Sequence, residues 1–172
     1  MNTIVRPMCS DDLERVLAWR NHPEVRSYMY THHRIAMEEH IRWFRNSEQN
    51  ESHHPMIFEL DGVPLGFVNL TESVKGHIAD WGFYLAPEVP RGTGPLLGKA
   101  ALDYAFDQLG LHKICGQALD FNVRSIRFHL AMGFQLEGTL RDQYFDDPHY
   151  HPIIHFGLLQ SEWHAKQRET ES

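Results

Sequence analysis

The pattern of hydrophobic and polar positions along the chain predicts a mixed α/β fold. Leu97, Ala101, Tyr104 and Ala105 recur at i, i+4, i+7 and i+8, which is typical of an amphipathic helix. Asp61-Gly62 separates two β-rich segments and is typical of a hairpin turn. Strands are predicted at 3–6, 55–60, 64–70, 77–85, 113–119, 134–144 and 150–159, and helices at about 11–21, 37–46, 94–109 and 122–132.

These elements form one continuous series without repeats, linkers or low-complexity segments. The length of 172 residues is enough for one domain with its own hydrophobic core. Asp11 and Glu14 have the spacing of a capping box and predict where the first helix begins. We therefore expect a single domain over residues 1–165, followed by a polar tail at 166–172 that is frayed.

Composition narrows the classes of partner. The formal net charge of −7 argues against a general nucleic-acid binder, which needs clustered Lys and Arg. No apolar run has the length of a membrane span, and the N-terminus lacks the pattern of a secretory signal. Only Cys9 and Cys115 are present, far apart in the sequence. We expect a soluble protein of the reducing cytoplasm that uses neither membrane nor nucleic acid.

The 13 histidines raise the question of a metal site. They include His32-His33, His53-His54 and the set His149, His151 and His155, but no HExxH motif or Cys-pair spacing accompanies them. Solvated or hydrogen-bonded histidines are the better interpretation, so no metal is predicted.

The glycine-rich stretch PRGTGPLLGKAAL at 90–102 lies between a predicted strand and a predicted helix. It is not a Walker loop, because Gly94 and Gly98 are too close and Ala100 stands where a hydroxyl is needed. Its spacing and mid-chain place also fit a dinucleotide fingerprint poorly. From the residues alone, two interpretations stay open: an anion site at a helix N-terminus, or a plain turn.

Further motifs occur in order along the chain: ADWGFYLAP at 79–87, RGTG at 91–94, LHKI at 111–114, NVRS at 122–125 and GF at 133–134. Together they resemble the GNAT acetyltransferases, in particular the RimJ/RimL-like branch, over nearly the whole chain. The resemblance implies a central mixed, mostly antiparallel sheet flanked by helices, and acetyl-CoA as cosubstrate. It implies a coenzyme site formed by Phe83, Tyr84, Leu85, Arg91, Gly92, Thr93, Gly94, Pro95, Asn122 and Ser125.

Two of these positions have a second interpretation, and one position departs from the family pattern. Asn122 and Ser125 are as well explained as helix caps as by contact with the coenzyme. Val89 stands where the family has Gln or Arg, which weakens the match only slightly because backbone amides carry most of the phosphate binding.

The reaction implied is direct attack of an amine on the thioester, without a covalent enzyme intermediate. Neither Cys9 nor Cys115 is therefore assigned as a nucleophile. His129 stands where many relatives have the tyrosine that protonates the leaving thiolate, so the resemblance makes it the candidate general acid. With an ordinary pKa near 6.5, a His donor predicts activity that falls early towards high pH. The alternative is that His129 only packs beside the coenzyme.

The general base is not assigned. Glu72, Asp80 and Gln117 are on strands that could border the site, but a route through water would leave no mark in the sequence.

The pattern WRNHPEVR, MYT and EHIRWF, at 19–26, 29–31 and 39–44, resembles one subgroup, the N-acetyltransferases of pseudaminic acid biosynthesis. These acetylate the 4-amino group of a UDP-linked 4-amino-4,6-dideoxy-N-acetyl-altrosamine. The resemblance implies an acceptor site formed by Arg20, Met29, His40, Thr71, Glu72 and Tyr84. Glu72 stands where a lysine can occur, which puts its phosphate contact in doubt. Each of these residues has a structural alternative, such as a helix cap, the core or an ion pair.

Two other functions stay open. A RimJ/RimL-type enzyme would acetylate a protein N-terminus, and a non-enzymatic module would bind acetyl-CoA without turnover. The sequence leaves the oligomeric state open, with a homodimer as one alternative. It also leaves open the destination of the sugar, which is flagellin or another glycosylated product.

Overall fold

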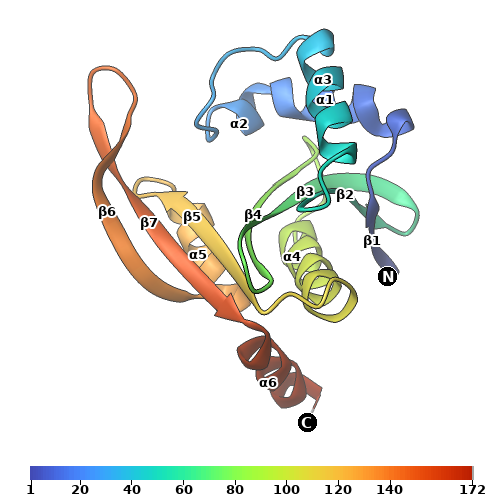
Figure 1. Cartoon of the computed structure of the whole chain (residues 1–172), viewed down its shortest axis with the longest axis vertical. Coiled ribbons are helices and arrows are strands. Elements are labelled where there is room, and N and C mark those ends of the chain that lie inside the picture. The colour runs from blue at the N-terminus through green and yellow to red at the C-terminus, as the bar shows by residue number, and fades with distance from the viewer. Residues whose placement is uncertain (172) are drawn as a thin grey trace. The chain divides into compact units, whose positions relative to one another are not determined.

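The computed structural model describes residues 1–171; Ser172, the last residue of the expected tail, lies outside them. Seven strands form one sheet in the order β1-β2-β3-β4-β5-β7-β6, with helices around it (Figure 1). The strands are β1 Thr3–Pro7, β2 His53–Leu60, β3 Val63–Val74, β4 Ile78–Leu85, β5 Lys113–Leu119, β6 Gln135–Phe145 and β7 Tyr150–Leu159. The helices are η1 Ser10–Asp12, α1 Leu13–Asn21, α2 Pro23–Arg26, α3 Met37–Glu48, α4 Thr93–Asp103, the π-helix η2 Tyr104–Gln108, α5 Val123–Met132 and α6 Gln160–Glu171.

Contacts divide the chain into two compact units. Among the described residues, unit 1 holds 1–71 and 82–101, and unit 2 holds 72–81 and 102–171. The sheet is mixed: β4 pairs with β5 in parallel, whereas β1 with β2, β2 with β3, and β7 with both β5 and β6 are antiparallel. The expected mixed, mostly antiparallel fold class is confirmed.

In unit 1, helices cover both faces of the first strands. The β2–β3 hairpin turns at Asp61 and Gly62, whose φ angles of 50° and 80° suit this dipeptide. Phe67, on one face of β3, joins a core with residues of α1 and α3. Gly66, on the other face, has no room for a side chain, because a Cβ there would lie 2.5 Å from Leu97 of α4. Alternation along β3 therefore separates an α1/α3 face from an α4 face.

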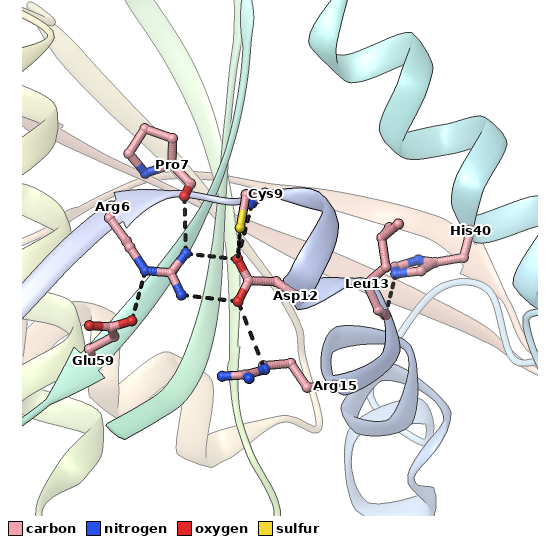
Figure 2. Close-up of polar contacts among 8 residues, drawn as sticks. All are labelled: Arg6, Pro7, Cys9, Asp12, Leu13, Arg15, His40 and Glu59. Atoms are coloured by element: carbon pink, nitrogen blue, oxygen red, sulfur yellow. Dashed lines mark hydrogen bonds and ion pairs between the residues drawn. The ribbon is translucent and has the colours of Figure 1, made fainter. Parts of the chain in front are cut away.

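A buried carboxylate ties the start of α1 to the sheet (Figure 2). Asp12 is 2% exposed and accepts two hydrogen bonds from Arg6, at 2.7 and 3.0 Å, while Arg6 also donates to Glu59. Burial by itself raises the pKa of Asp12, but the bonds from Arg6 and Cys9 outweigh it and lower that pKa to about 2. The pair fixes α1 against β1 and β2.

In unit 2, β5 lies between β4 and β7, and helices α5 and α6 accompany the strands. Gly133 ends α5 with a φ of 101°, as the sequence predicts for a helix followed by glycine. Trp163 of α6 is 2% exposed and donates a hydrogen bond to Asp103 at 2.9 Å. No helix among residues 1–171 is both long and apolar enough to span a membrane.

The structure corrects three local expectations. The cap before α1 involves Cys9 and Asp12 rather than Asp11 and Glu14, because Asp12 accepts from the Cys9 amide at 3.0 Å. The helix predicted at 94–109 changes to a π-helix at Tyr104. The tail expected to fray continues α6 as far as Glu171.

Candidate active site

The glycine loop of unit 1 has the geometry of an open helix start. Gly92 has a φ of 88°, and no atom lies within 4 Å of where its Cβ would be. Thr93 is 2% exposed, begins α4, and its hydroxyl donates to the carbonyl of Pro90 at 2.7 Å. Arg91, Gly92 and Pro95 are exposed and Gly94 is partly so. The exposed loop residues, Arg91 among them, are therefore accessible to an anion at the N-terminus of an 11-residue helix.

The end of β4 contributes Phe83, Tyr84 and Leu85, which are all partly buried. Tyr84 stacks on Phe67 with ring centroids 5.1 Å apart, so its side chain lies on the α1/α3 face. Burial raises the pKa of the Tyr84 hydroxyl, which stays protonated. Gly82 is on the same face of β4, and nothing lies within 4 Å of its Cβ position. Open space therefore adjoins Tyr84.

Arg20 of α1 is the least satisfied cation of this region. Its Nη2 donates to the Thr31 carbonyl at 3.0 Å, whereas its Nη1 is buried and has no hydrogen-bond partner in residues 1–171. Burial lowers the pKa of Arg20, and Tyr84 is the charge partner that opposes this most. A guanidinium that is partly desolvated and incompletely paired favours an anionic ligand.

Asn69 of β3 also has a buried polar atom without a partner, and sequence reasoning missed this residue. Its Oδ1 is buried and makes no hydrogen bond in the described part of the chain. His53 is its neighbour: burial lowers the pKa of His53, and the Asn69 side chain opposes this shift. A signal existed, because Asn69 alternates with Val68 and Leu70 and so shares the face of Phe67.

The other predicted acceptor residues divide between the units. Met29 and Thr71 are partly buried in unit 1. His40 is 4% exposed, bonds to the Leu13 carbonyl at 3.0 Å (Figure 2) and stacks on Trp43, which fits a structural link between α3 and α1. Glu72 belongs to unit 2, where it lies 3.8 Å from His77.

His129 of unit 2 is buried among the rings of Trp81, Phe134 and Phe156, which form an aromatic cage. It is 2% exposed, stacks on Phe156 at 4.9 Å and meets the edge of Phe134 at 5.0 Å. Its Nε2 accepts from the Trp81 indole N–H at 3.1 Å, and its Nδ1 lies 2.8 Å from the Ser125 carbonyl, which only accepts. Burial lowers the pKa of His129, so the expected ordinary pKa near 6.5 is corrected. The role of general acid stays a prediction, and this geometry gives it no support.

The remaining candidates have local partners. Asn122 caps α5 by accepting from the Ser125 amide at 3.2 Å, so its capping role is present. Burial raises the pKa of Cys115, which disfavours the reactive thiolate. Asp80 accepts from the Ser73 hydroxyl, and Gln117 is on β5. Nothing in this geometry selects a general base.

Several of the histidines pair with carboxylates. His151 bonds to Asp146 at 2.7 Å and lies 3.8 Å from Asp120. Within residues 1–171, no three His, Cys, Asp or Glu side chains are arranged to hold a metal ion.

The family model for the acetyltransferase (GNAT) domain matches residues 2–135, which include the glycine loop and the end of β4. This chain belongs to the GNAT acetyltransferase family. It is an acetyl-CoA-dependent N-acetyltransferase. The exposed residues of this loop, with the positive charge of Arg91 at a helix N-terminus, fit the pyrophosphate of that cosubstrate.

Two curated relatives are similar to the chain at nearly equal identity. Acetyltransferase PseH of Campylobacter jejuni is 27% identical over 139 residues, which are 79% of this chain and 85% of the relative. Spermidine N(1)-acetyltransferase of Escherichia coli is 26% identical over 166 residues, or 95% of this chain and 89% of the relative. The crystal structure of spermidine N-acetyltransferase from Vibrio cholerae, in complex with CoA and spermine, has a TM-score of 0.86 and 24% identity, and covers 94% of this chain and 97% of that one.

Proposed function

We propose that this GNAT enzyme acetylates the 4-amino group of a UDP-linked 4-amino-4,6-dideoxy sugar in pseudaminic acid biosynthesis. The amine attacks the thioester carbon of acetyl-CoA, the C–N bond forms, the C–S bond breaks, the nitrogen loses one proton and the thiolate takes one up. Phe83 to Leu85, Arg91 to Pro95, Asn122 and Ser125 are the proposed contacts to the coenzyme. Arg20, Met29, His40, Thr71, Glu72 and Tyr84 remain the proposed acceptor residues, Arg20 and Tyr84 with the strongest support.

The unpaired Arg20 Nη1 carries the choice of acceptor. A buried guanidinium without a full set of partners suits the diphosphate of a nucleotide sugar, whereas it repels a polyamine, whose nitrogens are cationic at neutral pH. The Nη1 atom is covered, so an anion reaches it after the flexible side chain turns. The Tyr84 ring provides an apolar wall for a 6-deoxy sugar, and the open space beside Gly82 gives it room.

Spermidine acetylation is the second candidate, because relatives with that activity match the chain over almost its whole length. N-terminal protein acetylation is the third. Family membership sets aside the module without turnover.

The test is the release of free thiol from acetyl-CoA with three acceptors in parallel: the UDP-4-amino sugar, spermidine and an N-terminal peptide. We expect the largest kcat/KM for the UDP sugar. Turnover of spermidine or peptide without turnover of the sugar would refute the proposal and assign the acceptor.

We further propose that unit 2 forms the interface of a homodimer. β6 is the outermost strand, and it exposes Leu136, Leu140 and Phe145 to 61%, 42% and 50%. Large apolar side chains exposed along an edge strand, here on both of its faces, are typical of a contact surface. Sedimentation should show a dimer in the wild type and a monomer after Leu136→Lys with Leu140→Lys; equal mass for both would refute the interface.

The proposed compartment is the cytoplasm. Cys9 and Cys115 are free thiols, as is usual under reducing conditions.

A further inference from the structure

The aromatic cage leaves His129 without an acidic proton. The Ser125 carbonyl is only an acceptor, so Nδ1 carries the hydrogen, and the Trp81 N–H is only a donor, so Nε2 carries none. A second hydrogen on Nε2 would face the indole N–H, donor against donor. His129 is therefore held as the neutral Nδ1–H tautomer.

The packing reinforces this arrangement from a third side. A Cβ on Gly116 of β5 would lie 2.5 Å from Nε2 of His129 and 2.9 Å from Nε1 of Trp81. Only glycine at this position leaves room for the bonded pair. Trp81 also stacks on Phe134 at 5.1 Å, so the indole cannot turn away without loss of core packing.

A neutral imidazole is a poor donor to a thiolate. Transfer of its Nδ1 hydrogen would leave an imidazolate, and would break the bond to Ser125 in a site that is 2% exposed. The attacking nitrogen, in contrast, becomes positively charged when the C–N bond forms, and is held next to the departing sulfur.

We propose that the acceptor nitrogen itself supplies the proton of the departing thiolate, directly or through one water, while Trp81 and Ser125 hold His129 as a neutral packing residue. The nitrogen loses one hydrogen, the sulfur gains it, and the products are the amide and free coenzyme A. This inference holds for any acceptor amine, so it does not depend on the UDP sugar.

Two measurements test the inference on the full-length enzyme, with whichever acceptor is turned over. The first is the ¹⁵N NMR spectrum of the His129 ring. We expect the Nδ1–H tautomer in the wild type at neutral pH, with a changed signature in Trp81→Phe and in Gly116→Ala. Gly138→Ala is the control, because nothing lies within 4 Å of that Cβ.

The second measurement is kcat as a function of pH for the wild type, His129→Phe and Tyr84→Phe. We expect no fall in wild-type kcat between about pH 7 and 9, and in both variants a loss well below the roughly 100-fold that removal of a general acid costs. A 100-fold loss for His129→Phe with an unchanged KM for acetyl-CoA would make His129 the donor. The same loss for Tyr84→Phe, with unchanged KM values for acetyl-CoA and for the acceptor, would assign the proton to Tyr84. Either result would overturn the inference.

Discussion

The α1/α3 face of unit 1 and the aromatic cage of unit 2 differ in whether their buried polar atoms have hydrogen-bond partners. On the α1/α3 face, Arg20 Nη1 and Asn69 Oδ1 are buried without partners. In the cage, both nitrogens of His129 are hydrogen-bonded. An unsatisfied buried polar atom costs stability, so it is retained where a ligand completes it. The comparison therefore supports the proposal that the α1/α3 face binds a ligand, whereas the cage is an interior that is complete without one.

The largest expected effect concerns Arg20. Arg20→Gln removes the charge but keeps a donor, and should lower kcat/KM for the UDP sugar by about 100-fold, because hydrogen bonds to charged groups are strong. The fall should appear mainly in the KM of the acceptor, with that of acetyl-CoA unchanged. Arg34→Gln is the matched control, because Arg34 is exposed. Equal kcat/KM values for the two variants would show that Arg20 does not bind the acceptor, and the proposed difference between the two regions would fail.

The cage should respond to mutation through stability. Trp81→Phe removes the indole donor to His129 and leaves a small cavity, so the free energy of unfolding should fall by about 2 kcal/mol. Urea denaturation measures it. A fall below about 0.5 kcal/mol, the size of a surface substitution, would show that the pair is not part of the core.

Asn69 should show the opposite balance. Asn69→Leu replaces an amide whose buried oxygen lacks a partner with an apolar group of similar size, so stability should stay equal or rise by up to about 1 kcal/mol, while the KM of the acceptor rises. Asn122→Ala is the contrasting variant: its oxygen caps α5, and its loss should cost about 1 kcal/mol. If Asn69→Leu destabilised the protein as Asn122→Ala does, Asn69 would be structural.

The smallest effect is the dependence of stability on pH. Burial lowers the pKa of His129 and His40 below 6.5, so at lower pH the unfolded chain binds more protons than the folded one. The free energy of unfolding should be level with respect to these two groups above pH 6.5 and fall as the pH drops below it. Denaturation curves from about pH 5 to pH 8 test this, since the ordinary histidine pKa of the unfolded chain, about 6.5, lies inside that window. Rising stability on acidification would contradict buried, neutral histidines.

Local patterns predicted most of the fold. The Asp61-Gly62 turn and the strand at 113–119 occur as predicted, because neighbouring residues determine both. The predicted cap of α1 was wrong because Asp12 accepts hydrogen bonds from Arg6 on β1, a residue outside the helix.

The candidate site depended more on distant contacts. The glycine loop could be found from its motif, but the state of His129 could not, because its partner Trp81 is 48 positions away. Arg20 was singled out from its pattern, whereas Asn69, inside a strand, carried no motif at all. Burial and pairing across the fold, which no spacing encodes, decide which of these groups is available to a ligand.

The most direct test of the central claim is a competition between acceptors. The wild-type enzyme, acetyl-CoA, the UDP-4-amino sugar and spermidine are mixed at equal acceptor concentrations, and mass spectrometry follows both acetylated products. The account predicts that acetylated sugar forms first and that the preference weakens in Arg20→Gln. Acetylated spermidine as the main product, with the same ratio in Arg20→Gln, would contradict it.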